Sequence, residues 1–154
     1  LYKAFPEVGG IVHTHSTEGV AWAQAGRDIP CYGTTHADTF YGPIPCARAL
    51  TPEEINGEYE KETGKVIIEE FNKRSLDPMA VSGVTVRNHG PFAWGKDEKS
   101  AVYNAVVLEE AARMARYTES INPSVEEVPQ ALKDKHYLRK HGKNAYYGQK
   151  GMEH

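Results

Sequence analysis

Three histidines in this sequence have the spacing expected of metal ligands. His13 and His15 are one residue apart in an alternating run, so their side chains share a face if the run is a strand. His89 lies in an Asn-His-Gly-Pro turn, in which Gly90 and Pro91 restrict the backbone. Three histidines with an open coordination position are typical of catalytic metal sites. The pattern predicts a divalent-metal centre, with zinc as the best candidate; the alternative is a set of histidines exposed at the end of a sheet.

Two acidic residues are candidates for further roles. Asp38 lies in a polar and aromatic segment, 33–42, and could act as a general base. An aspartate in such a segment could equally cap a turn. Glu60 belongs to a stretch rich in glutamate, and composition alone assigns it to a solvent-exposed helix face.

The C-terminal region is basic and then aromatic. Residues 130–141, which include His136, predict an exposed helix whose positive charge is favoured near a helix C-terminus. Attraction of an anionic substrate such as a phosphate is a second interpretation of the same charges. Tyr146 and Tyr147 follow the helix. They are either packing residues or part of a site that is completed in a neighbouring subunit.

The composition limits the class of protein. The chain has 154 residues, of which 40% are hydrophobic and 25% charged, which suits one globular domain. The formal net charge of −3 argues against a dedicated nucleic-acid or membrane-surface protein. Cys31 and Cys46 are too few for a disulfide framework, and we interpret them as small buried residues. No apolar run is as long as a membrane span, and we expect the protein to be cytoplasmic.

Periodicity and capping residues predict the elements that position these groups. Strands are expected at 11–15, 29–32, 44–46, 83–86 and 92–94, and residues 33–42 are expected to form a loop. Helices are expected at 19–25, at 51–74 with a break near Gly64, after Asp97, and at 130–141. The apolar stripe of the helix after Asp97 is formed by Ala101, Ala105, Leu108, Ala112 and Ala115, with Val102 and Val106 beside it.

The first residues have the pattern of an incomplete element. Leu1 and Phe5 are four residues apart and Pro6 follows, which predicts the last turn of a helix whose beginning is absent. We therefore expect residues 1–154 to be a single domain that lacks its N-terminal segment, as the C-terminal part of a longer polypeptide.

Taken together, several stretches resemble the class II aldolase and sugar-phosphate epimerase family, over nearly the whole chain. The stretches are 10–16 (GIVHTHS), 33–38 (GTTHAD), 54–60 (EINGEYE), 89–95 (HGPFAWG), 135–142 (KHYLRKHG) and 146–149 (YYGQ). The His-x-His pair is shared by the wider family, whereas the Thr-His-Ala-Asp and Tyr-Tyr-Gly-Gln segments resemble its epimerase branch.

The resemblance implies a fold and a set of site residues. The fold is an α/β/α three-layer sandwich, with a central, mostly antiparallel sheet and helices on both faces. His13, His15 and His89 match the three metal-binding histidines of the family. The other matched active-site positions are Asp38 and Tyr147 as acid/base residues, the tyrosine from an adjacent subunit, and Glu60 and His136 with less definite roles.

The resemblance also implies an activity and an assembly. The expected reaction is metal-dependent epimerisation of L-ribulose 5-phosphate to D-xylulose 5-phosphate at C4, by retro-aldol cleavage and re-addition through an enediolate that Zn²⁺ or another divalent metal stabilises. The expected assembly is a homotetramer with a sugar-phosphate site at each subunit interface. The family's phosphate-binding loops and an acidic metal-site residue would lie upstream of Leu1.

Two alternatives remain open. One is a class II sugar-phosphate aldolase, which releases its aldehyde product. The other is a non-catalytic, cupin-like metal-binding module, which also uses His-x-His and a later histidine. The long helices expected after Thr51 and Asp97 argue against the all-β barrel that a cupin requires.

Overall fold

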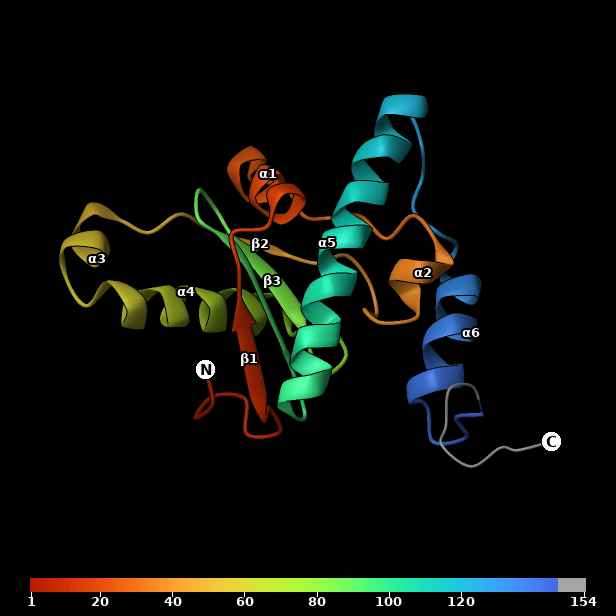
Figure 1. The fold of residues 1–154 in the computed structure, drawn as a ribbon, viewed down its shortest axis with the longest axis horizontal. Coiled ribbons are helices and arrows are strands. Elements are labelled where there is room, and N and C mark those ends of the chain that lie inside the picture. Colours follow the sequence, from red (N-terminus) through yellow and green to blue (C-terminus); the bar gives the residue numbers. More distant parts are fainter. Residues whose placement is uncertain (147–154) are drawn as a thin grey trace.

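A computed structural model describes residues 1–146, which form one four-stranded sheet and six helices (Figure 1). The strands are β1 (Gly10–His13), β2 (Cys46–Ala47), β3 (Gly83–Val86) and β4 (Gly90–Gly95). The helices are α1 (Thr17–Ala25), α2 (Thr34–Ala37), α3 (Pro52–Asn56), α4 (Tyr59–Arg74), α5 (Glu98–Ile121) and α6 (Gln130–His141). Among these residues, no helix has the length and apolar character needed to cross a membrane.

The sheet is mixed, with the strand order β1-β4-β3-β2. β4 pairs antiparallel with both β1 and β3, whereas β2 pairs parallel with β3. The expectation of a mostly antiparallel sheet is thus corrected to a mixed one. The reason lies in the connections: a short turn joins β3 to β4 and forces them antiparallel, while α3 and α4 cross over between β2 and β3.

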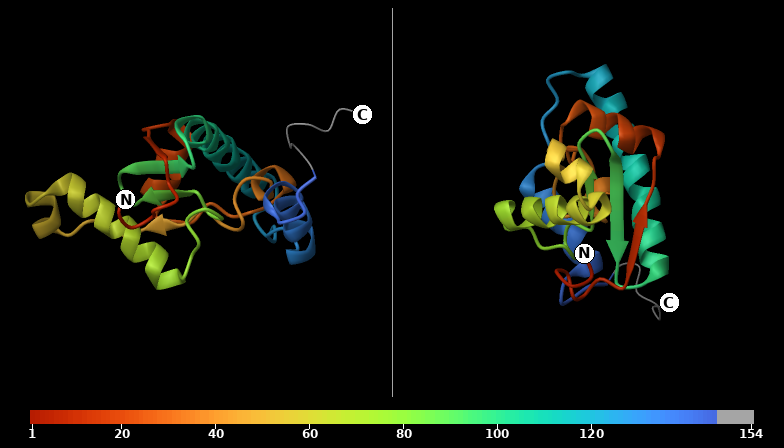
Figure 2. Two further views of the ribbon diagram at one scale, coloured as in Figure 1. Left: turned by 90° about the horizontal axis from the view of Figure 1, so that it is seen from below. Right: turned by 90° about the vertical axis from the view of Figure 1, so that its left-hand side faces the viewer.

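Hydrophobic side chains are buried on both faces of the sheet. On one face, the Trp94 ring of β4 packs against Phe71 of α4 and against Phe5, with ring centroids 5.3 and 5.5 Å apart. On the other face, Ala93 belongs to a core with Leu108 of α5. The right-hand view of Figure 2 shows α4 and α5 on opposite sides of the strands. Successive residues of one strand therefore tie the sheet to helices on either side.

The longest helix begins where the sequence predicts. Asp97 caps α5 through a capping box with Ser100, and the expected stripe is largely buried against the sheet. Val102 and Val106, expected beside the stripe, have 54% and 59% of their surface exposed. At 3.6 residues per turn they fall on the outer side of the helix, so a band of apolar side chains on α5 faces outward in the described chain.

Residues 51–74 form two helices and not one interrupted near Gly64. The break lies at Gly57, which ends α3, while Gly64 lies inside α4 with open space where a side chain would be. An isolated glycine inside a helix costs only about 1 kcal/mol, which the rest of α4 outweighs. The prediction of the break was therefore wrong in position.

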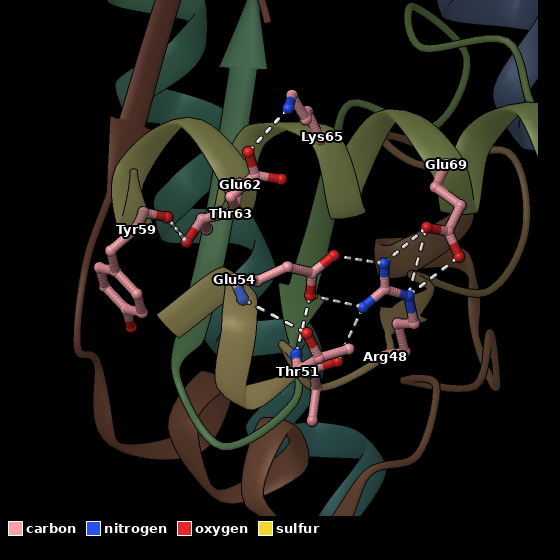
Figure 3. Close-up of polar contacts among 9 residues, drawn as sticks. Arg48, Thr51, Glu54, Tyr59, Glu62, Thr63, Lys65 and Glu69 are labelled. Atoms are coloured by element: carbon pink, nitrogen blue, oxygen red, sulfur yellow. Dashed lines mark hydrogen bonds and ion pairs between the residues drawn. The ribbon is translucent and has the colours of Figure 1, made fainter. Parts of the chain in front are cut away.

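A charged cluster holds α3 against α4. Arg48 donates to the carboxylates of Glu54 on α3 and Glu69 on α4, with the shortest contacts at 2.9 and 2.8 Å (Figure 3). Glu54 also accepts from the Thr51 backbone amide in the predicted capping box. The cluster joins the two helices across the break, after which α4 begins with Tyr59.

Two smaller expectations also changed. The segment 33–42, expected as a loop, contains the short helix α2, because Ala37 and Phe40 are both fully buried and draw the segment into a turn of helix. The extended segments 29–32 and 44–46 meet only at one isolated bridge, between Ile29 and Ile44.

Candidate metal centre

His13, His15 and His89 converge in the structure. One ring nitrogen from each lies within 4.8 Å of the others, and the Nε2 atoms of His13 and His15 are 3.2 Å apart. The ring centroids are 4.7 to 5.4 Å apart, each pair in an edge-to-face arrangement. His13 and His15 are exposed and His89 is half-buried. The three nitrogens thus surround a point that is open to a small ligand.

The strand and the turn bring these rings together. β1 ends at His13, opposite Phe92 of β4, whereas His15 lies beyond the strand and before α1. The strand expected through residue 15 is therefore too long, although the two rings do meet. The extended run continues one residue further, because the Thr14 amide donates to the Pro91 carbonyl at 3.3 Å. This pairing keeps His15 on the same side as His13.

The turn after β3 holds His89 rigidly. Asn88 has a φ of 64°, a left-handed conformation that asparagine tolerates, and the His89 amide donates to Val86 at 2.9 Å. A Cβ atom on Gly90 would lie 3.0 Å from the Thr14 carbonyl and 3.5 Å from the His15 ring. Glycine at this position lets the two ligand-bearing segments approach each other.

Outer contacts orient two of the rings. The His13 Nδ1–H donates to the Pro91 carbonyl at 2.9 Å, and the ring stacks on Phe92 at 4.0 Å. That bond leaves Nε2 of His13 as the metal-binding atom. Nδ1 of His89 lies 3.4 Å from the Tyr59 hydroxyl. Burial, followed by the neighbouring His13 and His15, lowers the pKa of His89, which favours the neutral ring that binds metals.

The donor set fits a divalent metal ion. Three imidazoles on a rigid frame, one of them with its tautomer fixed by a backbone carbonyl, are the arrangement used by catalytic zinc sites. The two cysteines take no part: Cys31 is fully buried, and burial raises its pKa to about 11, which disfavours the thiolate that a metal requires.

Asp38 and His136 form a second polar cluster, between α2 and α6. Nδ1 of His136 lies 3.0 Å from an Asp38 carboxylate oxygen, and Arg139 and Lys140 approach the same carboxylate at 3.2 and 3.4 Å. His141 contacts the Asp38 backbone carbonyl at 2.9 Å. Partial burial works to raise the pKa of Asp38, but the His136, Lys140 and Arg139 contacts outweigh it and leave the pKa below its usual value. Asp38 is therefore ionised at neutral pH.

The two clusters are separate within this chain. Figures 1 and 2 show α2 and α6 at one end of the molecule and α3 and α4 at the other, with the sheet that bears the histidines between them. Among residues 1–146, no hydrogen bond, ion pair or ring contact joins Asp38 or His136 to the three histidines. Glu60 is exposed in the first turn of α4. Tyr147 lies outside the described residues.

Sequence reasoning missed two contributors to this site. Tyr59 lies beside Glu60 and approaches His89, but nothing in its local sequence distinguishes it from the surrounding helix start. The Pro91 carbonyl acts through its backbone, which no side-chain pattern reveals. Both contributions depend on contacts between segments that are distant in sequence.

Comparison with known proteins identifies the family. The sequence profile described as "Class II Aldolase and Adducin N-terminal domain" matches residues 1–116. The chain belongs to the class II aldolase family. Class II aldolases generally use a divalent metal, and the histidine triad is present in this member.

Named relatives in this family are epimerases. The chain is 58% identical over 150 residues to the L-ribulose-5-phosphate 4-epimerase UlaF of Salmonella paratyphi B, and equally to that of Salmonella typhi. These matches cover 97% of this chain and 65% of each relative. The chain therefore spans a little under two thirds of the relatives' length.

Solved structures support the class II aldolase-like fold. An L-fuculose 1-phosphate aldolase matches with a TM-score of 0.67 and 16% identity, over 84% of this chain and 54% of its own. The L-fuculose 1-phosphate aldolase of Glaciozyma antarctica PI12 matches with a TM-score of 0.65 and 21% identity, over 90% and 47%. This fold excludes the cupin-like alternative, because the chain places a four-stranded sheet among helices and forms no barrel within residues 1–146.

Proposed function

We propose that the protein converts L-ribulose 5-phosphate to D-xylulose 5-phosphate by epimerisation at C4. The observation that carries this proposal is the 58% identity, over 97% of the chain, with an L-ribulose-5-phosphate 4-epimerase. The histidine triad supports it, because the reaction expected of that family needs a divalent metal. Zinc is the metal we propose, since three imidazoles are a common zinc ligand set.

His13, His15 and His89 would hold the metal. When bound, the ion would act as a Lewis acid that stabilises the enediolate left after the C3–C4 bond breaks. The chain itself keeps the ligand nitrogens in place. The Pro91 carbonyl holds His13 by Nδ1, and Tyr59 lies within reach of His89. These contacts limit ring rotation, so less conformational entropy is lost on binding.

Asp38 and Tyr147 are the proposed acid/base pair. One group removes the C4 hydroxyl proton, and the other returns a proton after the aldehyde has presented its opposite face. Asp38 can accept a proton because the His136, Lys140 and Arg139 contacts outweigh its partial burial, lower its pKa and keep it ionised at neutral pH. His136 positions the Asp38 carboxylate through Nδ1. Glu60 is proposed as a further substrate contact, since it is exposed one residue from Tyr59.

The separation of the two clusters supports a site shared between subunits. The substrate would lie between the histidines of one chain and the Asp38–His136 cluster of a neighbour. We propose a homotetramer with such sites at its interfaces, in which residues 1–154 form one domain of an α/β/α three-layer sandwich. The proposed cellular location is the cytoplasm.

A class II sugar-phosphate aldolase is the second candidate, favoured by the fold shared with L-fuculose 1-phosphate aldolase. Product analysis separates the two. The full natural protein, given L-ribulose 5-phosphate and a divalent metal, should form D-xylulose 5-phosphate without free glycolaldehyde phosphate, and a chelator should abolish the reaction. Accumulation of free aldehyde would favour the aldolase. Absence of any turnover in the metal-loaded protein would reject both.

A further inference from the structure

The N-terminal turn of α1 is capped from another helix. Ser16 occupies the N-cap position, but its side chain makes no capping bond and instead accepts from the Thr14 hydroxyl at 3.2 Å. The Glu109 carboxylate of α5 fills the role: its two oxygens accept from the backbone amides of Glu18 and Gly19, each at 2.9 Å. A carboxylate that accepts two amides at a helix N-terminus binds through charge-assisted hydrogen bonds. α5 therefore holds the start of α1.

A second contact ties the same turn to α5. The Glu18 side chain is buried and accepts two bonds from Arg116, both at 2.7 Å. Arg116 lies seven residues after Glu109, so the two side chains leave the same face of α5. The first turn of α1 is thus fixed through its backbone by Glu109 and through a side chain by Arg116.

This turn packs directly on the segments that carry the metal ligands. α1 begins two residues after His15. A Cβ atom on Gly19 would lie 2.7 Å from Pro91, the residue whose carbonyl holds His13. A Cβ on Gly90, the residue after His89, would lie 3.4 Å from Val20. A shift of the α1 start would therefore act on the position of His15 and on the packing of the Pro91 ring.

We infer that Glu109 and Arg116 are positioning residues of the metal centre: they fix the start of α1 against Pro91 and so set the geometry of His13 and His15. The inference rests on the proposed metal site. Neither residue touches the metal position. Removal of Glu109 leaves two backbone amides of α1 without their acceptor. We expect the first turn of α1 to shift so that water can accept from these amides. Loss of supporting contacts around metal ligands typically weakens metal binding by about 10–100-fold, and for this more remote contact we expect about tenfold.

The chain offers a matched control on the same two helices. Glu119 of α5 is half-buried, as Glu109 is, and ties the opposite end of α1 through Arg27, with contacts of 2.8 and 2.9 Å. Glu119→Ala removes the same kind of carboxylate from the same pair of helices, but far along α1 from the ligands. It should lower the melting temperature about as much as Glu109→Ala and leave the metal affinity within about twofold of wild type.

The experiment measures metal binding by the full natural protein, at a temperature where every variant is folded. Zn²⁺ affinity is obtained by competition with a chelator, and Co²⁺ is used to record the visible ligand-field spectrum. Glu109→Ala should weaken Zn²⁺ binding about tenfold and alter the Co²⁺ spectrum. Glu109→Gln, which keeps one acceptor oxygen, should lie between Glu109→Ala and wild type.

The outcomes separate this inference from the proposed function. If the wild type binds neither Zn²⁺ nor Co²⁺, the proposed metal site and the inference that rests on it are both refuted. If the wild type binds metal but Glu109→Ala and Glu119→Ala have the same affinity and the same Co²⁺ spectrum as wild type, the inference falls and the metal site stands. Should Glu109→Ala fail to fold, Glu109→Gln and Arg116→Lys decide: wild-type affinity and spectrum in both would overturn the inference.

Discussion

The histidine triad and the Asp38–His136 cluster are built in opposite ways. The triad consists of rings held by the backbone: Nδ1 of His13 donates to a strand carbonyl, and His89 lies in a turn shaped by its neighbours. The second cluster consists of charged side chains between α2 and α6, in which Arg139 and Lys140 surround one carboxylate. One region presents imidazole nitrogens on a rigid frame, whereas the other is rich in compensating charge.

The difference indicates a division of roles. A metal centre needs ligands whose positions do not relax when the ion is absent, and strand pairing supplies such rigidity. A proton-transfer group needs a defined ionisation state, and neighbouring cations supply it by lowering the pKa of Asp38. Because no contact joins the two regions within residues 1–146, we propose that they meet across a subunit boundary.

The largest effect should come from removing the ligands. The triple variant His13→Ala, His15→Ala, His89→Ala should contain no bound divalent metal by elemental analysis and should lose L-ribulose 5-phosphate turnover by at least about 10³-fold, since the Lewis acid contributes several kcal/mol. Its circular dichroism spectrum should remain that of wild type, because His13 and His15 are exposed. Equal metal content in the variant and wild type would refute the site.

A change in the second cluster should reduce turnover without removing metal. Asp38→Asn keeps the shape of the side chain but cannot accept a proton at neutral pH, and kcat should fall by about 10²-fold or more. Metal content by elemental analysis should match wild type. If Asp38→Asn lost metal together with activity, the two clusters would not have separate roles in metal binding and proton transfer.

Mixing the two inactive proteins tests whether the regions meet between subunits. Hybrid oligomers of the triple histidine variant and Asp38→Asn contain some interfaces with an intact triad from one chain and an intact Asp38 from the other. Turnover should therefore recover partly after subunit exchange. If mass measurement shows that hybrid oligomers have formed and they remain inactive, the histidines and Asp38 of each site come from one chain. Exchange between Asp38→Asn and Tyr147→Phe tests in the same way whether Tyr147 acts from another subunit than Asp38.

A smaller effect is expected at the edge of the triad. Tyr59→Phe removes the hydroxyl that lies 3.4 Å from Nδ1 of His89 and leaves the ring in place. Metal affinity, measured by chelator competition, should fall by up to about tenfold, with kcat at saturating metal changed little. Tyr103→Phe, an exposed tyrosine on α5, serves as the control and should bind metal as wild type does.

The smallest effect should come from the Arg48 cluster, which lies in neither region. Arg48→Met removes contacts to Glu54 and Glu69 that are partly exposed, so the melting temperature should fall by at most about 4 °C at pH 7. Arg48 lowers the pKa of Glu54 to about 2, so this small contribution is present above about pH 4.5 and disappears as the pH falls toward 2. The difference between the variant and wild type should therefore vanish in acid.

The sequence by itself determined the features that depend on neighbours along the chain. The caps at Thr51 and Asp97 were predictable because a side chain there bonds an amide three residues later. The bounds of α6, at Gln130–His141, followed from local periodicity. The triad was also predictable, because His13 and His15 share one short segment and His89 occupies a tight turn.

Only the tertiary structure decided which distant segments meet. Arg48 joins α3 to α4 across the break at Gly57, and the cap on α1 comes from Glu109, ninety residues later in the chain. The distance between the triad and Asp38 likewise depends on how α2 and α6 pack at the end of the molecule. Local patterns cannot predict such pairings, because their free energy comes from contacts between segments whose approach the whole fold determines.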